Sequence, residues 1–95
     1  MKKISREVCG AFMNRRKMRK SNTWTDGSSL YLFGNKIAWY DANNVLWITN
    51  CGFTTVTTKE RLNSLDGVDI RQKNFVWYLN GKVWDGCPIR VIPNM

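Results

Sequence analysis

The sequence predicts an α+β fold built on an antiparallel sheet. Short runs rich in aromatic and β-branched residues recur from residue 22 onward, and Gly-Asn, Asn-Gly and Asp-Gly turns separate them. An amphipathic helical pattern precedes these runs, and a second short helical segment interrupts them. We therefore expect an N-terminal helix, an antiparallel meander of three to four strands, a short helix at about 58–65 and a C-terminal β-hairpin. So many short strands favour a strongly curled sheet or a partly open small barrel.

The N-terminal helix is predicted from apolar spacing within residues 3–13. One stripe at helical periodicity carries Ile4, Val8, Ala11 and Phe12. Arg15 and Arg19 would project onto this stripe if the helix continued, so we place its end near Asn14. The basic run after it, residues 14–20, is then expected to be a loop or an extended arm.

The strands are predicted from β propensity and from the turns between them. The first group occupies residues 22–25, 30–33, 36–40 and 45–49, and the second group 68–72, 75–79 and 82–84. Strict alternation puts Ile37 and Trp39 on one face of their strand, and Ala38 and Tyr40 on the other. The tail, residues 87–95, contains two prolines and is expected to be irregular or an edge strand.

The segment between the two groups of strands predicts the second helix. Thr57 and Glu60 fit a capping box, in which the Thr57 hydroxyl accepts from the Glu60 amide and the Glu60 side chain reaches back. The helix would run from about Thr58 to Leu65. Gly67 ends it, because glycine tolerates the positive φ of a helix stop.

Ninety-five residues predict a single domain. Within 1–95 we distinguish a basic helix and arm (1–20), a β-rich body (22–86) and a tail (87–95). The expected core consists of Val8, Phe12, Leu32, Ile37, Trp39, Trp47, Leu62, Leu65, Ile70, Trp77, Leu79 and Trp84.

Charge is concentrated at one end of the chain. Of the formal net charge of +8, residues 1–20 carry +7, with eight basic side chains and the single acid Glu7. Such asymmetry is typical of proteins that bind a polyanion, usually nucleic acid. The alternative is a solvated end that keeps the protein soluble.

Several function classes find no support in the residues. The chain has no histidine, so the commonest general base is missing, and it has no P-loop, dinucleotide-binding or CxxC motif. Three widely spaced cysteines suggest neither a zinc site nor a disulfide framework, and reduced thiols suit a cytoplasm. No apolar run reaches the length of a membrane span, and the N-terminus does not resemble a secretory signal. We expect no enzymatic activity, cofactor, metal or membrane contact.

Two sets of residues are candidates for contacts with nucleic acid. Cations that can neutralise phosphates are Lys2, Lys3, Arg15, Arg16, Lys17, Arg19 and Lys20, joined by Lys59 and Arg61 near the start of the second helix. For the helix start, the alternative is that Thr57 and Glu60 already satisfy the free amides. Aromatic side chains that can stack on bases or contact a partner are Trp24, Tyr31, Tyr40 and Tyr78. Their alternative role is core packing.

The chain from 22 to 86 resembles a family of small proteins encoded by tailed bacteriophages. The matching residues are Asn22 and Thr23; Leu32, Gly34, Asn35, Ile37 and Ala38; Gly52, Phe53, Thr57, Thr58, Arg61, Leu62 and Asn63; and Trp77, Tyr78, Leu79, Asn80, Gly81, Trp84, Asp85 and Gly86. Phe33 departs from the family pattern, and Phe53 is the alternative to the Trp expected at its position; neither disturbs the fold prediction. The resemblance implies a phage source and carries over no site residue.

A phage source and a basic end together favour an accessory protein that binds DNA or RNA through its N-terminal arm in the host cytoplasm. The alternative is an inhibitor that binds a host protein of the defence or transcription machinery, or a ribonucleoprotein, through an exposed aromatic surface. Open sheet edges would also allow a homodimer.

Overall fold

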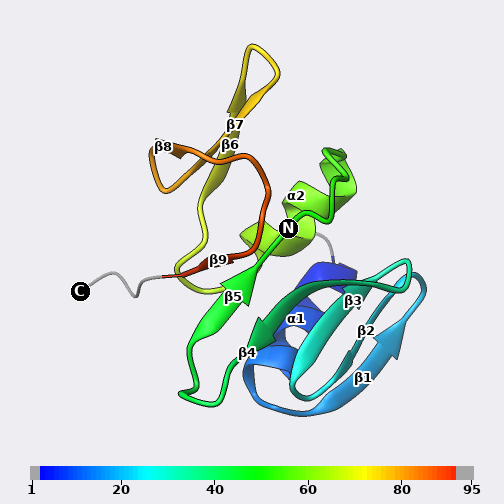
Figure 1. Cartoon of the computed structure of the whole chain (residues 1–95). Coiled ribbons are helices and arrows are strands. Elements are labelled where there is room, and N and C mark those ends of the chain that lie inside the picture. The colour runs from blue at the N-terminus through cyan, green and yellow to red at the C-terminus, as the bar shows by residue number, and fades with distance from the viewer. Residues whose placement is uncertain (1–2, 92–95) are drawn as a thin grey trace.

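The computed structural model describes residues 3–91, which fold into two helices and nine strands (Figure 1). Their bounds are α1 Lys3–Met13, β1 Lys17–Lys20, β2 Thr23–Asp26, β3 Ser29–Leu32, β4 Asn35–Tyr40, β5 Leu46–Ile48, α2 Val56–Asn63, β6 Ile70–Lys73, β7 Val76–Leu79, β8 Lys82–Val83 and β9 Ile89–Arg90. The predicted α+β class is confirmed.

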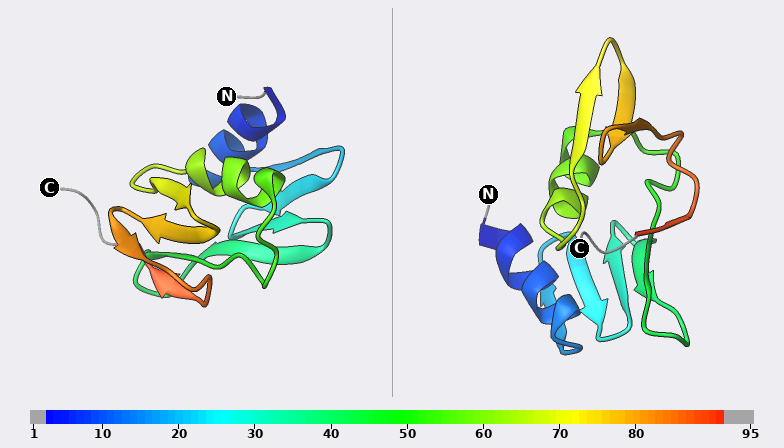
Figure 2. Two further views of the ribbon diagram at one scale, coloured as in Figure 1. Left: turned by 90° about the horizontal axis from the view of Figure 1, so that it is seen from above. Right: turned by 90° about the vertical axis from the view of Figure 1, so that its left-hand side faces the viewer.

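The strands form two separate antiparallel sheets, and neither closes into a barrel. The large sheet has the order β1-β2-β3-β4-β5-β9, and the small sheet has the order β6-β7-β8. The small sheet stands away from the large one, and α2 lies between it and α1 (Figure 2). The predicted second group of strands is therefore a sheet of its own. In the tail, expected to be irregular or an edge strand, β9 forms an edge strand of the large sheet.

Residues 17–20 of the basic run after α1 form strand β1, so the prediction of a loop or arm is wrong for them, while residues 14–16 form a turn. Arg15 adopts a positive φ of 58°, and the Arg16 amide donates to the Ala11 carbonyl, which turns the chain back at the end of the helix. Lys17 then pairs with Asp26 and Lys20 with Thr23. The meander thus has five strands, β1 to β5, where three or four were expected.

Helix α1 packs its predicted apolar stripe on one face of the large sheet. Val8 and Phe12 are fully buried there, opposite Leu30 and Leu32 of β3. Ten of the twelve predicted core residues are buried. The two exceptions are Trp39 and Trp47, which are only half-buried.

A β-bulge in β4 explains why Trp39 was misplaced. Leu30 pairs with Ala38, but its neighbour Tyr31 pairs with Lys36, so β4 holds one extra residue, Ile37. A bulge lets two consecutive side chains face the same way. Ile37 and Ala38 are accordingly both buried, and Trp39 turns to the outer face.

Helix α2 begins two residues earlier than predicted, and its N-cap is not Thr57. The cap is Thr55, whose hydroxyl oxygen accepts from the Thr58 amide at 3.1 Å. The capping box of Thr57 and Glu60 is therefore wrong. Glu60 instead accepts hydrogen bonds from Arg61 and from Ser5 of α1.

Candidate nucleic-acid interface

The face of the large sheet opposite α1 carries a stacked aromatic pair on β2 and β3. Thr23 and Thr25 point to the core, so Trp24 between them points outward, and Tyr31 lies directly across from it. The two rings are nearly parallel, with an interplanar angle of 9° and centroids 4.0 Å apart. Both are only half-buried, which leaves part of each ring open to solvent.

A second pair lies further along the same face, on β4 and β5. Trp39 pairs with Trp47 across the strands, and their rings are parallel within 6° at a centroid distance of 6.3 Å. The Trp47 indole donates to the Asp41 carboxylate at 2.8 Å. That bond and backbone donors in the turn lower the pKa of Asp41, so the carboxylate stays ionised and holds the Trp47 ring in place.

Cations stand beside both aromatic pairs. The Arg19 guanidinium carbon lies 5.4 Å from the centre of the Trp24 ring, and the Lys36 ammonium lies 5.4 Å from the centre of the Trp39 ring. Arg90 of β9 is the cross-strand partner of Trp47. We call these seven residues the aromatic face: Arg19, Trp24, Tyr31, Lys36, Trp39, Trp47 and Arg90.

The predicted N-terminal cations divide between the two sides of the large sheet. Lys17 and Arg19 alternate with Met18, which packs against the core, so both lie on the outer side. Lys17 there pairs across the strands with Asp26, whose carboxylate accepts from the Ser28 and Ser29 amides.

The remaining cations of this group lie on the helix side or in the turn. Lys20 and Lys3 both approach Glu7 of α1, at 3.6 and 3.7 Å. Arg15 lies over the Tyr40 ring at 3.3 Å and donates to the Asn44 side chain. Arg16 is exposed in the turn, and Lys2 lies outside the described residues.

The two cations predicted on α2 do not join the aromatic face. The Lys59 ammonium donates to Gln72 of the small sheet at 3.2 Å. Arg61 is only 3% exposed, and its guanidinium donates to Thr23, Ser5 and Glu60 at 2.7–2.9 Å. Arg61 therefore joins three elements inside the protein, and its position does not suit a phosphate contact.

Of the four predicted aromatic contacts, the structure brings only Trp24 and Tyr31 together. Tyr40 stacks on Phe12 on the helix side at 4.8 Å, and burial raises the pKa of its hydroxyl. Tyr78 lies on β7 of the small sheet.

Sequence reasoning missed Trp39 and Trp47 as surface residues, and also Lys36 and Arg90. For Trp47, the alternation of side chains along the strand indicated the outer face, because it places Trp47 opposite to the apolar Ile48. For Trp39, the same alternation gave the wrong face, because the bulge in β4 interrupts it.

A second exposed surface lies at the tip of the small sheet, which projects from the molecule (Figure 1). Phe75 is 95% exposed in the turn between β6 and β7, and both Asn74 and Phe75 adopt positive φ. Val76, also exposed, follows Phe75 as the first residue of β7, whereas the exposed Val83 of β8 lies farther from the tip, opposite Tyr78. Residues held in a left-handed backbone conformation are concentrated at functional sites, so Phe75 is a candidate contact residue.

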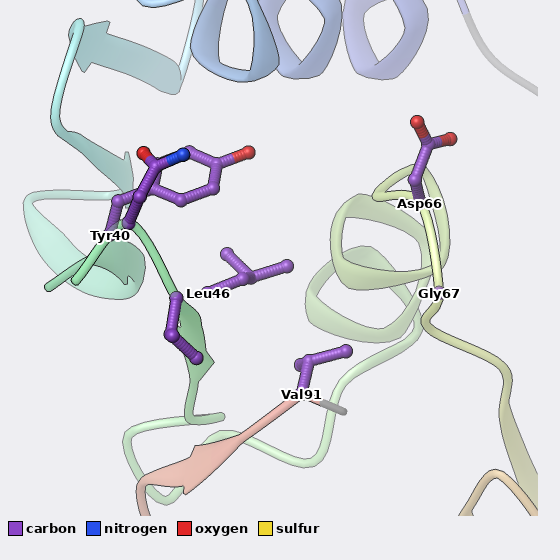
Figure 3. A pocket seen from close by; sticks show the side chains of 7 residues that line it. Tyr40, Leu46, Asp66, Gly67 and Val91 are labelled. Carbon is purple, nitrogen blue, oxygen red and sulfur yellow. The ribbon is translucent and has the colours of Figure 1, made fainter. Parts of the chain in front are cut away.

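A pocket of about 440 Å³ opens between the large sheet and the loop after α2 (Figure 3). Its lining consists of Tyr40, Asn44, Val45, Leu46, Asp66, Gly67 and Val91. Tyr40 and Asp66 lie on opposite walls, with apolar side chains between them. Nowhere in residues 3–91 do three His, Cys, Asp or Glu side chains gather as metal ligands would.

Comparison with protein families supports the phage origin that the sequence predicts. The model of the Kyanoviridae Gp96 protein family matches residues 1–90, which is nearly the whole chain. The chain belongs to this family. The family's description names a phage group and no activity. Comparison with curated proteins and with solved structures finds no match. Within the described residues, neither helix of this phage protein has the length and apolar character needed to cross a bilayer.

Proposed function

We propose that this Kyanoviridae protein binds nucleic acid in the host cytoplasm, with β1 as its phosphate-contacting element. The observation that carries this proposal is the position of Lys17 and Arg19, which point from the edge strand to the same side as four half-buried aromatic rings. Cations beside exposed aromatic rings are the side chains that polyanions with flat bases require.

The charge balance on this side of the sheet supports the same function. Asp26 and Asp41 are the nearby acids, and both carboxylates are occupied by hydrogen-bond donors of their own turns. Arg19, Lys36 and Arg90 have no carboxylate partner among the ion pairs of residues 3–91. Lys36 acts electrostatically on Asp26 and Arg90 on Asp41, but no ion pair fixes these side chains, so they can turn to a phosphate.

Salt-dependent binding tests the proposal. We would measure fluorescence anisotropy with labelled DNA and RNA oligonucleotides from about 50 to 200 mM salt, a range over which phosphate contacts lose affinity. The double variant Lys17→Gln/Arg19→Gln should reduce the slope of log K against log salt by roughly two. A matched variant, Lys59→Gln/Lys82→Gln, removes two cations of other elements and should bind as the wild type does. Equal slopes for wild type and the β1 variant would overturn the proposal.

The exposed tip of the small sheet favours a second candidate function, the binding of a host protein. Phe75 and Val76 are exposed apolar residues at this tip, and Lys73 is the cross-strand partner of Val76, which suits an acidic partner surface with an apolar pocket. Affinity purification from infected host cells should then recover one protein with the wild type and lose it with Phe75→Ser. Recovery that is equal with both would contradict this candidate, and nuclease treatment separates it from indirect capture through nucleic acid.

A further inference from the structure

We infer that the aromatic face binds unpaired bases, and that its ligand is a single-stranded nucleic acid lying across the strands of the large sheet. This inference rests on the proposed function and deepens it. It assigns stacking to the pairs Trp24–Tyr31 and Trp39–Trp47, and it adds Lys36 and Arg90 to the phosphate-contacting cations.

The four rings are not needed to build the core of the large sheet. The core is made on the opposite side, where Phe12 of α1 meets Leu30, Leu32 and Ala38 with no more than 3% exposure. Apart from neighbouring strands, α1 is the one element with substantial packing on β2 and β3 in the described chain. The outer face therefore holds large apolar rings at the surface that no other described element covers.

The bulge in β4 is what assembles this face. In a regular strand, Ile37 and Trp39 would face the same side, so Trp39 would also point into the core. The bulge breaks this alternation, because Ile37 is one residue more than β3 has to pair with it. With the bulge, Trp39 lies beside Trp47, and Lys36 lies opposite Tyr31. Bulges occur preferentially where a fold re-aims a side chain for function.

Lys36 occupies the position between the two aromatic pairs. It is the cross-strand partner of Tyr31, and its ammonium lies over Trp39. Lysine is a flexible side chain, so a base can replace it on a ring while its ammonium moves to the adjoining phosphate. The lost cation–π contact is a surface contact, and base stacking is the stronger of the two interactions.

The geometry favours a single strand over a duplex. In a duplex the bases stack on each other, and their faces are closed to a protein ring. A face that spans β2 to β5 is roughly 14 Å wide, from three inter-strand spacings of about 4.8 Å, which suits a few splayed nucleotides. Stacking tolerates every base, so we expect little sequence preference.

The test compares matched variants of the full chain on three ligands. Anisotropy titrations would use fluorescein-labelled dT12, U12 and a 12-base-pair duplex. Trp39→Leu and Trp24→Leu should each weaken binding to at least one of the single strands by about fivefold or more, because each removes a stacking ring. Trp39→Phe keeps an aromatic ring, so it should retain most of the affinity that Trp39→Leu loses. Phe75→Leu removes an exposed aromatic ring elsewhere and should change nothing.

A second measurement does not depend on the tryptophan variants folding. Lys36→Gln retains all rings and should weaken single-strand binding, while Lys59→Gln on α2 should not. Saturation with dT12 or U12 should also quench the intrinsic tryptophan fluorescence of the wild type. The strand that binds more tightly identifies the ligand as DNA or RNA.

The possible outcomes separate this inference from the proposed function. If binding is lost in the β1 variant but is unchanged by Trp24→Leu, Trp39→Leu and Lys36→Gln, the proposed function stands and the stacking inference fails. Tighter binding to the duplex than to either single strand also overturns the inference. If none of the three ligands binds, both fail.

Discussion

The guanidinium of Arg61 donates through Nε to the Thr23 hydroxyl, 2.9 Å away, and this bond fastens α2 to the second strand of the large sheet. A second nitrogen of the same group donates to Ser5 of α1 at 2.7 Å. Arg61 is 3% exposed, and its nearest carboxylate is that of its neighbour Glu60 at 2.8 Å. One buried guanidinium on α2 is thus hydrogen-bonded to both α1 and the large sheet.

Replacement of Arg61 should affect stability rather than ligand binding. Arg61→Met keeps much of the side-chain volume but removes the donor to the Ser5 and Thr23 hydroxyls, and it removes the cation that lies beside the Glu60 carboxylate. We expect the free energy of unfolding, measured by urea titration, to fall by about 3 kcal/mol. Lys59→Met, on the same helix but at its surface, should change it by less than about 0.5 kcal/mol. An Arg61→Met protein that is stable but fails to bind nucleic acid would show that Arg61 contacts the ligand instead.

The cap of α2 distinguishes two threonines that look alike in the sequence. Thr55 accepts from the Thr58 amide, so Thr55→Ala should lower the free energy of unfolding by about 1 kcal/mol. Thr57 lies inside the first turn and donates or accepts in no capping bond of residues 3–91, so Thr57→Ala should be close to neutral. Thermal melts followed by circular dichroism would compare the two. A larger loss for Thr57→Ala would mean that the helix starts at the capping box.

These two helices and most of the strands could be predicted because local signals determine them. Helical spacing located α1 to within a residue of its end, and Asn80-Gly81 marked the turn between β7 and β8. The cap was misassigned because the segment contains four threonines, and several of them fit an N-cap pattern. The N-cap preference of threonine does not by itself show which of these threonines caps the helix.

The candidate site was predicted only in part, since pairing between distant segments creates it. The position of β1 depends on β2, and that of β9 depends on β5, which lies about forty residues earlier in the chain. The bulge at Ile37 depends on how Tyr31 and Lys36 align across two strands. Charge composition pointed to Arg19, but only the sheet register shows that it lies beside Trp24.

The hydrogen bond from Trp47 to Asp41 predicts that stability and tryptophan fluorescence depend on pH in acidic solution. The donors in this turn lower the pKa of Asp41, so its ionised form contributes stability above its unfolded pKa of about 3.9. That contribution is lost as the pH falls through the lower value of the folded protein. Tryptophan fluorescence should therefore stay constant from neutral pH down to about 5 and change in more acidic solution.

The variant Asp41→Asn isolates the bond to Trp47. An asparagine oxygen can still accept from the Asn43 and Val45 amides, as the Asp41 Oδ1 does, but its amide group cannot accept from the indole. We expect the fold to persist, the acid transition to shrink, and single-strand binding to weaken because the Trp47 ring is less firmly held. Unchanged fluorescence and binding would show that packing against Trp39 suffices to hold the ring.

The three cysteines should differ sharply in reactivity, because only the thiolate reacts with an alkylating agent. Cys9 lies on the buried face of α1, where its thiol donates to the Arg61 carbonyl of α2, and burial raises its pKa to about 12. Cys51 and Cys87 are exposed, and the hydrogen bond and charge of Asp85 raise the pKa of Cys87. Mass spectrometry after iodoacetamide treatment at about pH 8 should find Cys51 and Cys87 modified and Cys9 protected. In urea all three should react, and Asp85→Asn should speed the reaction of Cys87. Modification of native Cys9 as fast as that of Cys51 would show that α1 does not stay packed against α2 and the core.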